Sequence, residues 1–143
     1  MPTRFPASRY IESSALVAAL LEGDKEARAS IRARGMRITS ALTMTEISRA
    51  VLRARLGGRI TSQQERTLLF TLQRFTRRCH IVSVTEAILA QAGRPFPAEP
   101  IRTLDAIHLA TAEALGHPPA LVTIVTRDLR VRENAILGGH PVE

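Results

Sequence analysis

The fold is decided by the stretch RTLDAIHLATAEALG at 102–116, with the apolar run LVTIV at 121–125 and the triplet TRD at 126–128 behind it. The first stretch predicts an almost entirely apolar helix that carries one carboxylate, Asp105, in its first turn. The apolar run predicts a buried strand that ends beside a second carboxylate, Asp128. We therefore expect two acids at element ends that share one edge of a sheet.

Strands and helices alternate along the rest of the chain. We predict strands at 9–12, 36–39, 80–84, 121–125 and 141–142, and helices at 15–21, 24–35, 43–56, 61–78, 85–92, 102–116 and 128–138. Three prolines between 94 and 100 predict a loop. Alternation of this kind is typical of an α/β fold, a three-layer α/β/α sandwich around a mostly parallel sheet of about five strands.

Length and composition limit the class of protein. At 143 residues, with 45% hydrophobic residues, the chain is long enough for one domain, 1–143, with a real core. No apolar run approaches the roughly 18 residues of a membrane span, and the N-terminus lacks the pattern of a cleavable signal. Cys79 is the single cysteine, which agrees with a reducing compartment. We expect a cytoplasmic protein with no membrane partner.

The charge balance points to an acidic partner. The net charge is +7, and Lys25 is the only basic residue that is not arginine. Arginine forks suit phosphate groups, and nucleic acid is the commonest partner of a basic protein. An alternative of equal weight is that arginine enrichment reflects codon composition and a solvated surface. Aromatic residues make up only 3%, which argues against a stacking platform for single strands.

Four acids lie at predicted element ends. Glu12 closes the first strand, and Glu46 lies near the start of the third helix, while Asp105 and Asp128 are described above. In parallel sheets ligands bind outside the carboxyl ends of the strands. Carboxylates held close without a counter-ion repel one another, so convergence itself calls for a cation, and Mg²⁺ or Mn²⁺ prefers such hard oxygen ligands. The predicted metal-binding and catalytic set is Glu12, Glu46, Asp105 and Asp128.

Each acid also has a structural interpretation. Thr43 and Glu46 have the spacing of a capping box, which explains Glu46 without a metal. Asp105 lies near a helix N-terminus, where the macrodipole stabilises a carboxylate. Asp128 has the position of an N-cap. Their joint placement at one edge of the sheet favours the metal site, because unrelated caps need not converge.

Three further side chains have two interpretations each. Arg49 and Arg53 follow Glu46 by one and two helical turns and are candidates for binding RNA phosphates. The alternative, slightly favoured, is an ion pair between Glu46 and Arg49 with Arg53 in solvent. His108 lies three residues after Asp105; we expect a hydrogen-bonded core histidine ahead of a group in the site.

Several stretches together resemble the PIN domain, specifically the VapC-type toxins of toxin–antitoxin pairs. These stretches are YIESSAL at 10–16, TEI at 45–47, LDAIHLATA at 104–112 and VTRD at 125–128. The resemblance implies that Glu46, Asp105 and Asp128 occupy the family's acidic metal-binding positions. It places Ser13 or Ser14 at the hydroxyl position beside the first acid, and Thr126 is a further candidate for a supporting hydroxyl.

The resemblance implies an activity and partners. We expect a Mg²⁺- or Mn²⁺-dependent endoribonuclease, with RNA as substrate, a cognate antitoxin protein as partner, and a homodimer in which the apolar helix at 62–75 offers a surface. The family's first acid is ordinarily aspartate, whereas this chain has Glu12. Because one extra methylene displaces the carboxylate, an alternative is a PIN-like module that binds RNA or protein with weak or no catalysis. A receiver-like phosphoryl-signalling domain is disfavoured, since no lysine ends a late strand.

Overall fold

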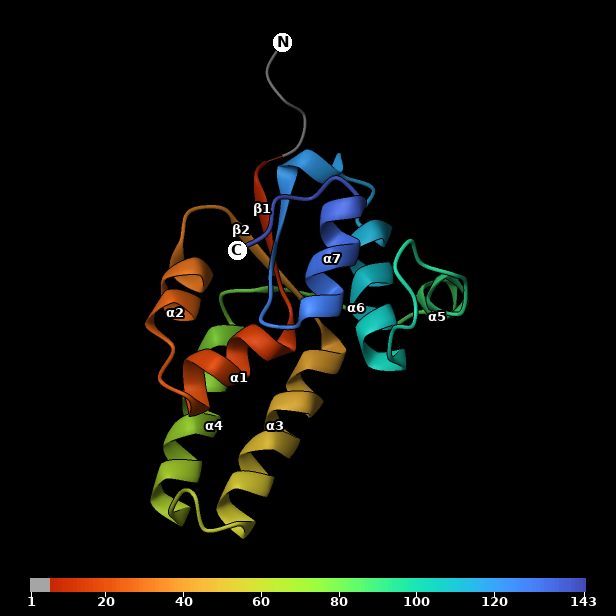
Figure 1. Cartoon of the computed structure of the whole chain (residues 1–143). Helices are drawn as coiled ribbons and strands as arrows, with labels where there is room; N and C mark the ends of the chain where they lie inside the picture. The colour runs from red at the N-terminus through yellow and green to blue at the C-terminus, as the bar shows by residue number, and fades with distance from the viewer. Residues whose placement is uncertain (1–5) are drawn as a thin grey trace.

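A computed structural model describes residues 6–143 and contains a parallel sheet enclosed by helices (Figure 1). Its strands are β1 (Ser8–Ile11), β2 (Met36–Ser40), β3 (His80–Val82) and β4 (Val122–Val125). Its helices are α1 (Ser13–Leu21), α2 (Lys25–Arg32), α3 (Ala41–Leu56), α4 (Ser62–Thr76), α5 (Glu86–Ala92), α6 (Thr103–Ala114) and α7 (Leu129–Leu137), with a short 3₁₀ turn, η1 (Pro119–Leu121). The predicted alternation of strands and helices is confirmed.

The sheet has the order β3-β2-β1-β4, and every neighbouring pair is parallel. Residues 6–143 contain four strands, so the expected count of about five is slightly too high. The predicted strand at 141–142 reduces to one parallel bridge between Ile124 and Val142, because Pro141 has no N–H to extend a ladder. The third strand is shorter than predicted: its partner β2 ends at Ser40, which pairs with Val82, and α3 begins at the next residue.

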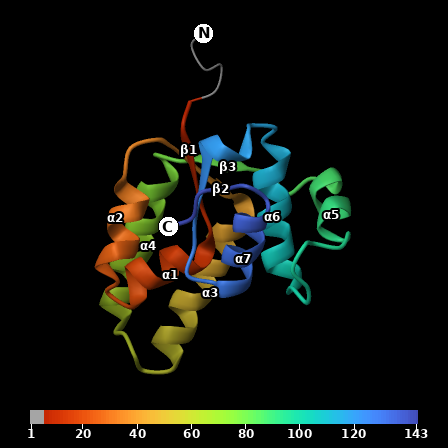
Figure 2. The ribbon, with the colours of Figure 1, turned by 45° about the horizontal axis from the view of Figure 1, so that its top comes forward.

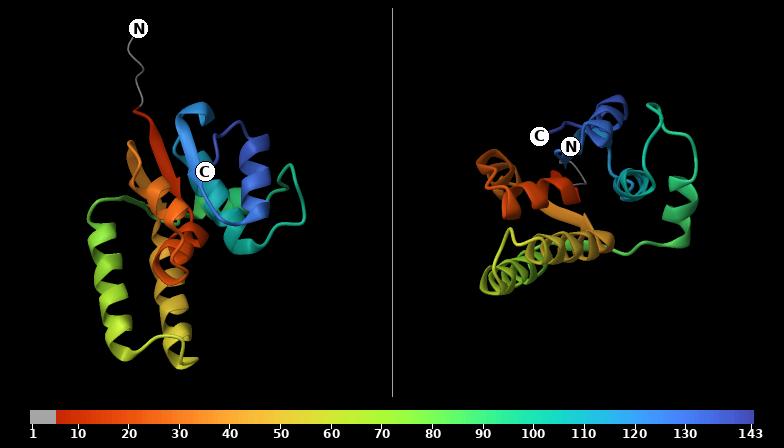
Figure 3. Two further views of the ribbon diagram at one scale, coloured as in Figure 1. Left: turned by 60° about the vertical axis from the view of Figure 1, so that its left-hand side comes forward. Right: turned by 60° about the horizontal axis from the view of Figure 1, so that its bottom comes forward.

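Period-two alternation along the strands divides the core into two parts. Tyr10, Ile38 and Ile124 contact one cluster, which includes residues of α5, α6 and α7. Ile11 and Val125, one position further along their strands, contact a second cluster built from α1, α2, α3 and α4. Because successive side chains of a strand point to opposite faces, β1 and β4 each supply both clusters. The result is the predicted α/β/α sandwich, with the two helical layers on either side of the sheet (Figures 2 and 3).

Two helix starts differ from the sequence prediction. The helix α3 begins at Ala41, directly after β2, and Ser40 is its N-cap, with its hydroxyl accepting from the Leu42 N–H at 3.1 Å. The predicted capping box of Thr43 and Glu46 is therefore wrong: Thr43 lies inside the helix. In α1 the N-cap is Glu12, whose carboxylate accepts from the Ser14 N–H, and the helix begins at Ser13, two residues before the predicted start at 15. A strand that passes into a helix without a loop leaves the residue at the junction as the cap.

Long helices extend past the sheet on one side. α3 and α4 run side by side as a hairpin that leaves the sheet at its carboxyl end (Figures 1 and 3). Among the described residues, no helix combines the length and the hydropathy that a membrane span requires.

Candidate active site

A cleft of about 700 Å³ opens at the carboxyl ends of β1, β2 and β4. All four predicted acids line it, and so do both candidate RNA-binding arginines. The lining consists of Glu12, Ser13, Ser14, Val17, Glu22, Leu42, Thr45, Glu46, Arg49, Ala50, Arg53, Leu104, Asp105, Arg127 and Asp128. Parallel strands place the residue that follows each strand at this edge, and α6 adds Asp105 from its first turn.

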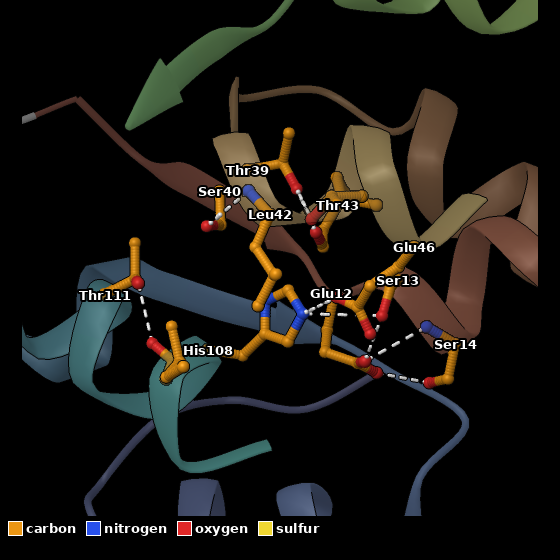
Figure 4. Close-up of polar contacts among 12 residues, drawn as sticks. Glu12, Ser13, Ser14, Thr39, Ser40, Leu42, Thr43, Glu46, His108 and Thr111 are labelled. Atoms are coloured by element: carbon orange, nitrogen blue, oxygen red, sulfur yellow. Dashed lines mark hydrogen bonds and ion pairs between the residues drawn. The ribbon is translucent and has the colours of Figure 1, made fainter. Parts of the chain in front are cut away.

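Glu12 is the most enclosed of the four acids, with 2% of its surface exposed. Its Oε1 accepts from the Ser13 hydroxyl at 2.9 Å and from the Ser14 N–H at 3.0 Å, and its Oε2 accepts from the Ser14 hydroxyl (Figure 4). Oε2 also accepts from the Thr126 hydroxyl at 2.7 Å. Its backbone N–H donates to the carbonyl of Val125 at 3.0 Å. The carboxylate therefore links the ends of β1 and β4 to the start of α1. The three predicted supporting hydroxyls, of Ser13, Ser14 and Thr126, all donate to it.

Glu46 reaches the cleft from α3 and is held by a buried histidine. Its Oε1 lies 2.6 Å from Nε2 of His108 (Figure 4). Nδ1 of His108 lies 2.8 Å from the Tyr10 hydroxyl. His108 is 1% exposed, and the Glu46 side chain is 21% exposed. The prediction of a hydrogen-bonded core histidine is confirmed, and the same residue also contacts the site.

Asp105 has an uncompensated carboxylate. Its Oδ2 is buried and has no hydrogen-bond partner within the described part of the chain. Burial raises the pKa of Asp105 to about 6, and the negative charges of Asp128 and Glu12 add to the rise. A carboxylate in this condition is stabilised by a proton or by a cation, so Asp105 marks the point of excess negative charge in the cleft.

Asp128 lines the cleft and also caps a helix. Its Oδ1 accepts from the N–H groups of Arg130 and Val131, each at 2.9 Å, so it is the N-cap of α7 as predicted. Its own N–H donates to the Thr126 hydroxyl at 3.0 Å, which links it to Glu12 through one shared side chain. Within the described residues, Oδ2 of Asp128 accepts no hydrogen bond. The negative charge of Asp128 helps to raise the pKa of Asp105.

The donor set fits a divalent cation in chemistry, although it is not a closed cage. Among residues 6–143, no three acidic, histidine or cysteine side chains are arranged to hold an ion without movement. The carboxylates nevertheless offer hard oxygen donors, and Mg²⁺ commonly retains several waters and takes only one or two protein carboxylates. The orphaned Oδ2 of Asp105 is the atom whose condition a cation improves most.

Arg49 of α3 differs from the favoured expectation, whereas Arg53 lies in solvent as expected. Glu46 contacts His108, and in the part of the chain that the structure describes neither Arg49 nor Arg53 makes an ion pair. Both are exposed and line the cleft. The predicted pair between Glu46 and Arg49 is therefore wrong, because the shorter contact to His108 directs the carboxylate towards the sheet.

Two residues were not predicted from the sequence to belong to the site: Arg127 in the lining of the cleft, and Tyr10 in the core behind it. Arg127 forms part of the lining and is fixed by Asp24, which accepts from its Nε at 2.8 Å. Tyr10, the partner of His108, comes from the buried face of β1. In the sequence, the only indication that Tyr10 belongs near the site is its position two residues before Glu12. Its contact with His108, which is 98 residues further along the chain, depends on the folded sheet.

Comparison with known proteins agrees with this arrangement. The family model for the PIN domain matches residues 9–137 of the sequence. The chain belongs to the PIN domain family. Among curated PIN proteins of Mycobacterium tuberculosis, Ribonuclease VapC35 is 35% identical over 130 residues, covering 88% of each chain. Ribonuclease VapC46 is 37% identical over 135 residues, covering 90% of this chain and 91% of the relative.

Solved structures show the same PIN fold. VapBC2 from Rickettsia felis, bound to a DNA fragment from its promoter, has a TM-score of 0.67 at 13% identity and covers 95% of this chain and 97% of its own. VapC20 of Mycobacterium tuberculosis, a toxin that cleaves the sarcin-ricin loop, has a TM-score of 0.64 at 15% identity, with coverage of 87% and 93%. FitAB bound to a DNA fragment has a TM-score of 0.65 at 19% identity, with coverage of 94% and 93%.

The raised pKa of Asp105 predicts a change in thermal stability that can be measured without an activity assay. In chelator at pH 7.5, Asp105→Asn should raise the midpoint of thermal unfolding by a few degrees, because it removes a repelled, partly buried charge. The folded-state pKa of about 6 exceeds the ordinary 3.8, so the wild type gains stability as the pH falls through 6 towards 3.8. The difference between the two proteins should therefore shrink over that window.

Differential scanning calorimetry at pH 7.5 and pH 4 measures this effect. Glu133→Gln removes a charge from an exposed position on α7 and serves as the control, for which no shift above about 1 °C is expected at either pH. Destabilisation by Asp105→Asn at pH 7.5 would contradict the account of the site.

Proposed function

We propose that this protein is a metal-dependent endoribonuclease, the toxin of a VapBC-type toxin–antitoxin pair, which hydrolyses phosphodiester bonds of RNA. The observation that carries the proposal is the group of four acids around one cleft, with Asp105 left uncompensated. The ribonuclease names of relatives that share more than a third of the sequence support it. Glu12, Glu46, Asp105 and Asp128 are the proposed catalytic group.

The four acids have different parts in the proposal. Asp105 and Asp128 hold Mg²⁺ or Mn²⁺ directly, since each retains a carboxylate oxygen that no described hydrogen bond uses. Glu46 is the third ligand, from its free Oε2. Glu12 adds its charge and holds the strand ends in place through its four donors. When bound, the divalent ion supplies Lewis-acid polarisation of the scissile phosphate.

The positive side chains at the cleft bind the substrate backbone. Arg49 and Arg53 are one helical turn apart on α3, exposed, and free of the ion pairs that would occupy them. Guanidinium groups bind phosphate oxygens with paired hydrogen bonds and carry no base information. The choice of RNA target is therefore made elsewhere than at these two residues.

The proposed partners follow from the comparisons. Solved structures that share the fold include VapBC from Salmonella typhimurium with DNA and a toxin–antitoxin complex from Klebsiella pneumoniae. We propose by analogy that this chain binds a cognate antitoxin and pairs as a homodimer. A purified antitoxin from the neighbouring reading frame would be expected to block the cleavage described below.

A second candidate function is a PIN module that binds RNA or protein with little or no catalysis. The observation in its favour is that both oxygens of Glu12 are already engaged by hydroxyl and N–H donors. A carboxylate in that state has little capacity left for an ion. The shorter side chain of aspartate at this position would release some of these donors.

Cleavage of a mixed pool of structured RNAs tests the proposed function. The wild type should cut with Mg²⁺ or Mn²⁺ and not with chelator, and Asp105→Asn should lose at least about a hundredfold in rate, because an Asn side chain cannot supply the anionic oxygen. The matched control Glu133→Gln should cut at the wild-type rate. Metal-independent cutting, or undiminished cutting by Asp105→Asn, would contradict the proposal.

The same assay with Glu12→Asp separates the two candidates. A gain in cleavage supports a nuclease that its longer first acid slows. Absence of cleavage in both forms, from folded protein, supports the binding module.

The salt dependence of RNA binding tests the arginines. In chelator, Arg49→Ala and Arg53→Ala should each weaken binding to unrelated RNAs uniformly and lower the slope of log K against log salt by about one. Arg78→Ala is the control, since Arg78 comes just before β3 begins, at the opposite edge of the sheet. Fluorescence anisotropy at several salt concentrations measures the slopes, and equal slopes for all three variants would exclude a special role for α3.

A further inference from the structure

His108 joins three elements at the floor of the cleft. It lies on α6, its side chain is 1% exposed, and it contacts Tyr10 of β1. It also contacts Glu46 of α3 (Figure 4). Its Nε2 also lies 3.4 Å from the hydroxyl of Ser13, which donates to Glu12. One imidazole therefore stands between the two glutamates of the proposed site.

The hydrogen-bond donors and acceptors fix the direction of the two bonds that link Tyr10, His108 and Glu46. A carboxylate oxygen only accepts, so the 2.6 Å contact to Glu46 requires a proton on Nε2. In a neutral imidazole with its proton on Nε2, Nδ1 can only accept, so the Tyr10 hydroxyl, 2.8 Å away, donates a hydrogen bond to it. The order is then Tyr10 O–H to Nδ1, and Nε2–H to Oε1 of Glu46. It assigns the Nε2–H tautomer to His108.

This order of hydrogen bonds fixes the side chain of Glu46, which would otherwise be flexible. The Glu46 side chain is 21% exposed and has three rotatable bonds, so an unbonded Glu46 would sample several rotamers. The bond from His108 holds one carboxylate oxygen against the sheet and leaves the other to the cleft. Side chains that orient metal ligands in this way typically contribute 10- to 100-fold to metal affinity.

We propose that His108 is a positioning residue, which fixes the Glu46 carboxylate for a divalent cation through the chain Tyr10–His108–Glu46. The inference rests on the proposed metal site and adds a role for two residues that do not touch the ion. Tyr10 acts one step further away, because its hydroxyl sets the tautomer of His108. Neither residue is assigned a proton transfer to RNA.

Mn²⁺ affinity, measured by isothermal titration calorimetry without RNA, tests the proposal. His108→Leu retains an apolar side chain of similar size but donates no hydrogen bond, and it should weaken Mn²⁺ binding by about tenfold or more. His108→Gln places an amide N–H near the position of Nε2 and should stay within about threefold of the wild type. Ile107→Val, a buried change on the same helix, controls for general loss of packing and should leave the affinity unchanged.

A second measurement keeps the test sharp if His108→Leu folds poorly. ¹⁵N NMR of the imidazole should show the Nε2–H tautomer in the wild type and a mixture of the two tautomers in Tyr10→Phe, which also should bind Mn²⁺ several-fold more weakly. An Nδ1–H tautomer in the wild type would overturn the proposal. Equal Mn²⁺ affinity of folded His108→Leu and wild type would overturn it as well.

The outcomes separate this proposal from the proposed function. If the wild type binds Mn²⁺ and cuts RNA while the His108 and Tyr10 variants match it, the positioning role alone fails. If the wild type neither binds Mn²⁺ nor cuts RNA, the metal site fails, and the positioning role fails with it.

Discussion

The structure depends on one buried carboxylate, that of Glu12. Its four donors come from the start of α1 and from the segment after β4, while its backbone continues β1. A buried carboxylate without donors is costly, so the hydroxyls of Ser13, Ser14 and Thr126 are required for this fold as much as for any chemistry. The consequence is a rigid meeting point of two strand ends, around which the other acids are arranged.

The remaining acids show how a parallel sheet gathers charge. Asp128 is used as a helix cap and Glu46 is held by His108, so each has a structural partner on one oxygen. Asp105 has none on its buried oxygen, and its pKa is raised first by burial and then by the negative charges of Asp128 and Glu12. Folding has therefore left an excess of negative charge facing the cleft, which is the condition that a divalent cation relieves. Our proposal of a nuclease rests on this imbalance together with the family of the chain.

Much of the fold could be predicted from local patterns, because they coincide with tertiary burial. The stretch at 102–125 forms α6 and β4 as expected, and the capping position of Asp128 is confirmed. The capping box of Thr43 and Glu46 failed since it is a local pattern, whereas the start of α3 is set by the end of β2. The contact between Glu46 and His108 was likewise beyond local reasoning, because it joins helices on opposite faces of the sheet.

The central claim is that this edge of the sheet holds a divalent cation beside Asp105. Anomalous diffraction from crystals of the wild-type protein soaked in Mn²⁺ tests it most directly. The account predicts a peak within coordination distance, roughly 2.0–2.3 Å, of Oδ2 of Asp105, which disappears in Asp105→Asn crystals. A wild-type cleft without a peak, or a peak coordinated by residues outside the four acids, would contradict it.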